Sequence, residues 1–394
     1  MQTRAIIALL LCIVLKSAIK ILILIGYPKK TMRSLLMIVS IALIGFSCKP
    51  SADKSSLPED TKVRHARGYA QHDWQMDSVY SRLGLKDSVN DLQWKAVISP
   101  HDNYRFAARL YYESLRGINA PNIILIGVAH SARNYQLQDK LIFGTFKEWE
   151  SPYGGIKVSS LNEEIMGKLP REDFIVHDSM QIIEHSLEAI IPFLHKKNRS
   201  AEIVPILVPY INYEGIDSIS THLAEAVQEI LREKNWEYGK DVAIVISNDA
   251  VHYGDLEWGG STTMAPMGTD EAGTEKARQM DLEIINTCLT NELTADKIKL
   301  FTEYTVQQED YKEYKWVWCG RYSVPFGLSF ANKLNELEYN EELTGTFLGY
   351  ETSIDHPLIE VEDIGMTVSA LSTNRHWVAR SEERRVGKEC RSRW

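Results

Sequence analysis

The chain has 394 residues, with 44 Lys+Arg against 53 Asp+Glu, a formal net charge of -9 and 44% hydrophobic residues. This length and apolar content suffice for a sizeable buried core in one large domain or two, and they exclude a disordered or fibrous protein. The acidic balance argues against nucleic acid as a partner, because binding to a phosphate backbone depends on clustered Lys and Arg.

The N-terminal segment has the pattern of an export signal. Residues 1–47 contain six basic residues and no Asp or Glu, and a second candidate start, Met32, precedes an apolar run from Leu35 to Ile44. A basic start, a short apolar run and small residues before a cleavage point are typical of a secretory signal. Cys48 at that point resembles the lipidated first residue of a bacterial lipoprotein. We therefore expect a leader over 1–47, with its true start at Met32, and export to the cell envelope with a lipid anchor on Cys48.

The alternative for this segment is a membrane-spanning anchor, which needs about 20 apolar residues. The stretch 5–25 approaches that length but contains Lys16 and Lys20. In the lipoprotein interpretation, residues 48–93 comprise the lipidated cysteine, a flexible polar tether and an N-terminal arm.

The C-terminal residues 380–394 (RSEERRVGKECRSRW) are charged, lack helical or strand periodicity, and resemble the translation of a sequencing-library adapter. The alternative is a basic, solvated tail. The leader and this tail each carry six basic residues and the tail three acidic ones, so residues 48–379 have a net charge of -18. This body retains Cys288 and Cys319, too few for a thiolate zinc cage, although a single disulfide between them is compatible with export.

Short apolar runs alternate with amphipathic segments between residues 94 and 379, which we interpret as the folded domain. Nearly continuous apolar runs are typical of strands that are buried on both faces of a sheet. They occupy residues 95–99, 122–128, 202–208 and 242–247. The alternation predicts an α/β fold with three layers, in which helices flank a mostly parallel central sheet.

Two helices are predicted between these strands. Apolar residues at helical spacing over 219–231 follow Asp217 and Ser218, either of which is a suitable N-cap. A second stripe over 187–194 is interrupted by Pro192, which is expected to kink the helix.

Three of the four apolar runs lead into a histidine: His101, His130 and His252. A fourth, His185, opens the second predicted helix and can project into the same crevice. Ligands of open α/β sheets collect beyond the carboxyl ends of the strands, and imidazole is a ligand for iron, copper and zinc. Each histidine taken alone is more simply a hydrogen-bonded loop residue. Their convergence predicts a metal site formed by His101, His130, His185 and His252.

Other polar residues near these histidines have two interpretations each. Asp249, two residues beyond a strand, is a candidate ligand or orienting acceptor, and Glu188 is a ligand or a first-turn helix acid. Asp102 and Tyr104 form a candidate acid/base pair, although Tyr104 could instead be a packing residue. Arg321 is a candidate clamp for an anionic group, but a structural role is the simpler interpretation.

Several ordered motifs resemble those of the Memo-like family, also named component B of the AmmeMemoRadiSam system. They are SPHDNY (99–104), GVAHS (127–131), ESPYGG (150–155), EHSLEAIIPFL (184–194), VPILV (204–208), SNDAVHYG (247–254) and CGR (319–321). The resemblance implies an α/β fold similar to class III extradiol dioxygenases and a site that binds iron or copper. It would make His101, His130 and His185 metal ligands.

The sequence departs from this family at one expected ligand. Some members have a cysteine directly before the histidine of the SNDAVHYG-type motif, where this chain has Val251. We therefore expect no thiolate in the site, with His252 or Asp249 in its place. Loss of a soft ligand favours Fe(II), with copper or zinc as alternatives. Export is a second departure, because the family is regarded as intracellular.

Two functions from different classes follow. The first is a metal-dependent oxidative, dioxygenase-like enzyme, in which His185, Asp249 or Tyr104 moves protons. The alternative is a non-catalytic, envelope-anchored protein that binds a metal or a partner, and a hydrolytic zinc site is a third possibility. The expected partner is a small molecule, a peptide or another AmmeMemoRadiSam protein, with membrane contact through the lipid anchor.

Overall fold

A computed structural model describes residues 60–65, 68–86, 90–256, 263–355, 359–367 and 372–386, with backbone alone for 381–386. All of them belong to one of two compact units, Glu59–Trp394. The predictions on the leader, on Cys48 and on residues 387–394 lie outside the described residues. Within the described ranges, no helix combines the length and apolar character needed to cross a membrane.

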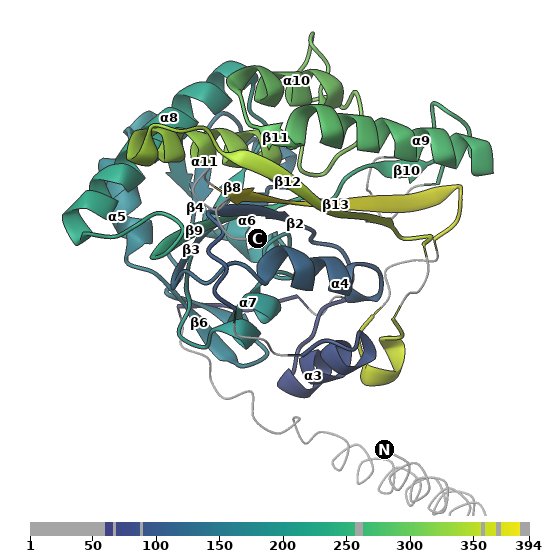
Figure 1. Cartoon of the computed structure of the whole chain (residues 1–394), viewed down its shortest axis with the longest axis horizontal. Coiled ribbons are helices and arrows are strands. Elements are labelled where there is room, and N and C mark those ends of the chain that lie inside the picture. The colour runs from purple at the N-terminus through teal and green to yellow at the C-terminus, as the bar shows by residue number, and fades with distance from the viewer. Residues whose placement is uncertain are drawn as a thin grey trace, which may run out of the picture. The chain divides into compact units, whose positions relative to one another are not determined.

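The described domain is built on a single mixed sheet (Figure 1). Its hydrogen-bonded order is β1 (Thr61–Lys62), β5 (Glu148–Ser151), β6 (Gly154–Val158), β8 (Glu202–Val208), β3 (Asn122–Val128), β9 (Val242–Ser247), β2 (Ala96–Ser99), β13 (His376–Val386), β12 (Thr344–Thr352) and β11 (Asn291–Glu292). Three further strands pair beside this path: β4 (Leu141–Phe143), β7 (Phe174–Val176) and β10 (His252–Gly254). The four predicted strands form its parallel centre in the order β8-β3-β9-β2, which confirms that prediction.

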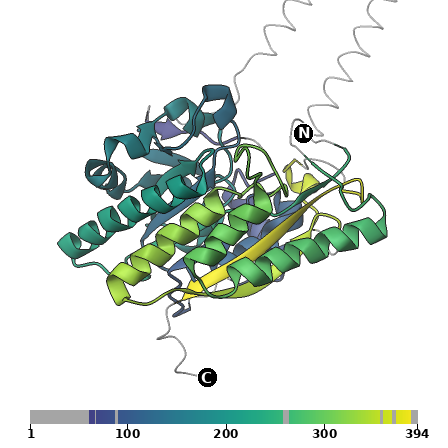
Figure 2. The same cartoon turned by 90° about the horizontal axis from the view of Figure 1, so that it is seen from above.

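Helices cover both faces of this centre, as the view from above shows (Figure 2). Successive residues of one strand point to opposite faces, so β3 places Ile124 and Ile126 in one core and Ile123 and Leu125 in the other. The first core is covered by α5 (Leu161–Lys168), α8 (Tyr213–Lys234), α9 (Glu271–Ile284), α10 (Ala295–Thr305) and α11 (Ser323–Tyr339). The second is covered by α3 (Asp73–Arg82), α4 (Tyr104–Leu115), α6 (Asp178–Ile183) and α7 (Ile191–Lys197). The predicted three-layer α/β fold is therefore confirmed.

Helix boundaries differ from the sequence-based expectations. α7 begins at Ile191, so Pro192 lies in its first turn, where a missing N–H costs no helical hydrogen bond, and no kink results. α8 begins at Tyr213 because the side chain of Asn212, and not that of Asp217 or Ser218, caps it by accepting a hydrogen bond from the Gly215 N–H.

The last strand also extends further than expected. β13 continues beyond Ala379 to Val386, and its residues 383–385 pair with β2 although the sequence there has no strand periodicity. Backbone pairing does not require an alternating side-chain pattern, because the ladder joins main-chain groups. The adapter origin of residues 380–394 stays a prediction.

A glycine sets how closely α11 approaches the sheet. A Cβ at Gly327 would lie 2.6 Å from Cγ1 of Ile246 on β9, closer than side chains tolerate. We expect Gly327→Ala to lower the free energy of unfolding by about 1–3 kcal/mol, because overpacking outweighs the better helix propensity of alanine. Urea denaturation measures the change.

The matched control is Gly167→Ala in α5, where a Cβ would meet no atom within 4 Å. This variant should be neutral or more stable by up to about 1 kcal/mol. Equal effects of the two substitutions would contradict close packing at Gly327.

Candidate metal centre

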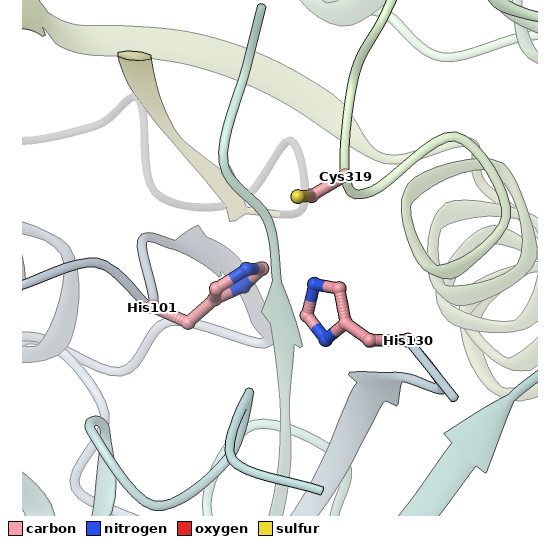
Figure 3. A group of neighbouring side chains, drawn as sticks. All are labelled: His101, His130 and Cys319. Carbon is pink, nitrogen blue, oxygen red and sulfur yellow. The ribbon is translucent and has the colours of Figure 1, made fainter. Parts of the chain in front are cut away.

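Two of the predicted histidines lie at the carboxyl ends of β2 and β3, the two parallel strands that flank β9. His101 follows β2 and His130 follows β3, and both side chains point toward the same space (Figure 3). Cys319, from the loop before α11, completes the group. One donor atom from each of His101, His130 and Cys319 lies within 4.8 Å of the others. Two imidazoles and a thiolate are a donor set for zinc, copper or iron.

Glu184 orients His130. Its Oε1 lies 2.9 Å from Nδ1 of His130, and its Oε2 accepts a hydrogen bond from the His130 backbone N–H at 2.8 Å. Burial opposes ionisation of Glu184, but His130 and further hydrogen bonds hold its pKa well below the ordinary value. Because a carboxylate accepts the Nδ1 proton, Nε2 of His130 is left as the donor atom for a metal.

Ser247 assigns the tautomer of His101. The Ser247 hydroxyl donates its one proton to the Ser186 carbonyl at 2.7 Å, and its Oγ lies 2.9 Å from Nδ1 of His101. The Nδ1–H therefore donates to Ser247, which leaves Nε2 as the ring nitrogen that faces other partners. This Nε2 is 3.2 Å from Oδ2 of Asp249, while Oδ1 of Asp249 accepts from the His101 backbone N–H. The predicted association of Asp249 with a site histidine is thus present in the geometry.

Cys319 corrects the expectation that the site lacks a thiolate. Its Sγ lies 3.0 Å from Nε2 of His252. Burial alone would raise the pKa of the Cys319 thiol, but the charge of His252 and hydrogen bonds from His101 and His130 hold it well below the ordinary value. The CGR motif therefore supplies the sulfur donor that Val251 does not provide. The CGR motif was the feature of the sequence from which Cys319 could have been predicted as part of the site.

The two body cysteines are both free, so the disulfide considered between Cys288 and Cys319 is not formed. Cys288 lies in the apolar core, where burial raises the pKa of its thiol to about 12. It is a packing residue, whereas Cys319 is surrounded by imidazoles.

The other two predicted histidine ligands lie beside the group in different ways. His252 contacts Cys319 and so lies beside the group of His101, His130 and Cys319. Burial alone would lower the pKa of His252, but the charge of Cys319 raises it above the ordinary value. His185 stacks on His130 with ring centroids 4.8 Å apart and forms a second possible metal group with His130 and Glu184. The side chains of His130 and His185 are 28% and 21% exposed, so solvent reaches this side of the centre.

Tyr104 differs from its predicted acid/base role. It is fully buried, its hydroxyl donates to the Ala189 carbonyl at 2.7 Å, and its ring packs against Tyr111 and Phe193. Its neighbour Asp102 pairs with Arg380, whose Nε lies 3.1 Å from Oδ2 of Asp102. In the structure Tyr104 is therefore a packing residue, which was the alternative interpretation of this position.

Glu188 anchors the N-terminal arm beneath the centre. Its carboxylate pairs with the buried ammonium of Lys62 and accepts a hydrogen bond from the His65 backbone N–H at 2.9 Å. Lys62 also donates to the Glu184 carbonyl at 3.3 Å. The arm therefore supports the segment that orients His130, and Glu188 is occupied by these contacts.

Asp281 on α9 holds the loop that leads to Cys319. Its Oδ1 accepts hydrogen bonds from Nε1 of Trp316 and of Trp318, both at 2.7 Å, and its Oδ2 accepts from the Tyr350 hydroxyl at 3.0 Å and the Val251 N–H at 3.3 Å. Burial raises the pKa of Asp281 to about 6 despite these donors. One buried carboxyl thus joins the Cys319 loop to the segment that carries His252.

We predict a pH-dependent difference in stability between the wild type and Asp281→Asn. The pKa of the Asp281 carboxyl is about 6 in the folded protein, above the ordinary 3.8, so folding favours its protonated form. The contribution of Asp281 to the free energy of unfolding therefore grows as the pH falls from about 6 toward 3.8. The difference in free energy of unfolding, wild type minus variant, should rise by about 2 kcal/mol between pH 7 and pH 4. Denaturant titrations at each pH measure it.

The control is Asp77→Asn, at a carboxylate whose side chain is 68% exposed. Its stability difference from the wild type should stay nearly constant with pH. Parallel pH curves for the wild type and Asp281→Asn would contradict a raised pKa at Asp281.

Curated relatives of this chain carry the name "MEMO1 family protein". One from Aquifex aeolicus (strain VF5) is 29% identical over 163 residues, which are 40% of this chain and 54% of the relative. One from Pyrobaculum arsenaticum is 32% identical over 193 residues, 46% of this chain and 62% of the relative. One from Thermotoga maritima is 28% identical over 168 residues, 40% and 54% respectively. The chain thus spans only a little more than half the length of these relatives.

The profile of a protein family described as "Memo-like protein" matches residues 67–368, well over half of the chain. This range contains His101, His130 and Cys319, and all seven motifs on which the resemblance rests. The chain belongs to the Memo-like protein family.

Proposed function

We propose that this chain binds a transition metal through His101, His130 and Cys319 and uses it in an oxidative, dioxygenase-like reaction. The donor set itself supports the proposal, because one donor atom of each histidine and the thiol lie within 4.8 Å of one another and Nδ1 of each histidine is bound by a protein oxygen. The oriented rings reduce the entropy that a metal must overcome on binding.

A metal held there would supply Lewis acidity and, if it is iron or copper, electron exchange with a bound molecule. The presence of Cys319 removes the argument that favoured Fe(II) over copper, so the donor set suits iron, copper or zinc. Among the residues of the chain, Glu184 fixes the ring of His130, and Ser247 fixes that of His101.

We propose two groups for proton transfer. Burial raises the pKa of Asp249, whose Oδ2 lies 3.2 Å from Nε2 of His101, so this carboxyl can hold a proton close to the centre. His185 lies at the partly exposed side and can exchange a proton with solvent. Tyr104 is not placed for this role, because its hydroxyl is bound to the Ala189 carbonyl.

We predict that the wild type, purified without oxygen, contains a stoichiometric metal and that His101→Ala, His130→Ala and Cys319→Ser each lose most of it. Each substitution removes one of three donors that act together. Glu184→Gln should weaken metal affinity by roughly 10–100-fold, because it alters the acceptor for Nδ1 of His130. Elemental analysis and competition with a chelator measure both effects.

His222→Ala is the matched control, because His222 pairs with Asp173 away from the centre and should leave metal content unchanged. Retention of the metal by the Cys319 variant and by both histidine variants would overturn the proposed centre. Oxygen consumption with candidate substrates then separates the two function classes. Metal binding without any turnover would support the alternative of a non-catalytic binding protein.

The cellular context is part of the proposal and rests on sequence alone. We propose export with a lipid anchor on Cys48, and a small molecule, a peptide or another AmmeMemoRadiSam protein as the partner. The leader pattern and the polar segment after it support the export. Fractionation of cells that express the wild type or Cys48→Ser tests the anchor.

A further inference from the structure

Arg321 is a buried cation without a carboxylate partner. It is 5% exposed, and its Nε has no hydrogen-bond partner in the described part of the chain. The groups that act on its charge are tyrosine hydroxyls, and no ion pair joins it to an acid among the residues the structure describes. A guanidinium presents five N–H donors in a planar fork, so such an environment leaves donors for an external acceptor.

Three aromatic rings surround this guanidinium. Its Cζ lies 3.5 Å from the ring centroid of Tyr314, 4.5 Å from that of Tyr322 and 5.7 Å from that of Tyr210. Cation–π contacts stabilise the charge partly, but ring faces do not accept the in-plane hydrogen bonds of the fork. The hydroxyls of Tyr314 and Tyr322 also hydrogen-bond to the guanidinium. The tyrosines therefore hold Arg321 in place and leave its Nε without a partner among the described residues.

Arg321 belongs to the same loop as the sulfur donor of the centre. It follows Cys319 by two residues, and Tyr314, which stacks on Arg321, is influenced electrostatically by both Cys319 and His130. Gly320, which lies between Cys319 and Arg321 in the sequence, packs against Asn248, since a Cβ at Gly320 would lie 2.1 Å from Oδ1 of Asn248. Both polar atoms of the buried Asn248 amide are also without partners. Unsatisfied donors and acceptors thus gather around the loop that carries Cys319.

The surroundings of the Arg321 charge differ from those of Arg64. Arg64 is a second buried arginine, and its three guanidinium nitrogens have no partner in the described ranges. Burial lowers the pKa of Arg64 although the carboxylates of Glu150 and Glu188 lie near it. At Arg321 the corresponding neighbours are tyrosines. The two carboxylates would repel an anion that approached Arg64, whereas the neighbours of Arg321 carry no such acids.

We propose that Arg321 is the binding residue for an oxyanion group, a carboxylate or a phosphate, on the molecule that the metal centre receives. A charged hydrogen bond from Nε would satisfy the donor that the fold leaves open, and the tyrosine rings would contact the apolar part of that molecule. The assignment rests on the proposed function for its position beside the metal. It narrows the substrate class to anionic small molecules or anionic groups of a peptide.

Isothermal titration calorimetry tests this with benzoate and inorganic phosphate, and with benzamide as the uncharged isostere, on zinc-loaded and metal-free protein. The wild type should bind both anions and bind benzamide more weakly. Arg321→Met should lose roughly 10–100-fold in anion affinity, because a charged hydrogen-bond pair is removed, while its zinc content stays unchanged. Arg133→Met is the matched control, since Arg133 also lies over Tyr210 but is 64% exposed and paired with Glu313.

The outcomes separate the two proposals. If the wild type takes up no metal, the proposed function fails, and the anion affinity of metal-free protein still decides the role of Arg321. Unchanged anion binding in Arg321→Met, or equal affinity of the wild type for benzoate and benzamide, would overturn the oxyanion site. If Arg321→Met does not fold, Arg321→Lys, which keeps the charge but not the fork, should bind both anions more weakly than the wild type with unchanged zinc content, and the benzoate–benzamide comparison needs no variant.

Discussion

Parallel pairing of β2, β9, β3 and β8 is the constraint on which the candidate centre depends. Parallel strands place their carboxyl ends at one edge of the sheet, so residues far apart in sequence meet where these strands end. His101 and His130 come together for this reason, and Ser247 at the end of β9 lies between them and binds the ring of His101. The apolar faces of the strands stabilise this arrangement, because each strand is buried on both sides.

At the carboxyl ends of the parallel strands, the charged side chains are paired with one another, and the same pairs orient the candidate ligand His130. Glu184 neutralises His130 and also accepts backbone N–H groups, and its backbone carbonyl receives Lys62 from the N-terminal arm. Glu188 accepts the other contact of Lys62. Such buried pairs add little net stability, but each leaves a costly charge if one partner is removed. The arrangement thus favours one geometry of the histidine rings over alternatives.

The sequence predicted the parts of this structure that follow from local pattern. Continuous apolar runs located the four central strands, and strand ends located His101 and His130. The boundary of α7 was missed because a proline in a first turn and a proline at a kink look alike in a hydrophobic pattern. Cys319 was missed as a candidate ligand because it lies in an irregular loop, and Asp281, on a different helix, holds that loop by hydrogen bonds. Such contacts between side chains that are distant in the sequence leave no periodic pattern from which they could be predicted.

The most direct test of the account is the ligand environment of the metal itself, measured by X-ray absorption at the metal edge on wild-type protein. We expect a sulfur scatterer, at about 2.3 Å if the metal is zinc, together with imidazole nitrogen. The sulfur signal should disappear in any residual metal-bound fraction of Cys319→Ser. A shell of nitrogen and oxygen without sulfur in the wild type would contradict the central role given to Cys319.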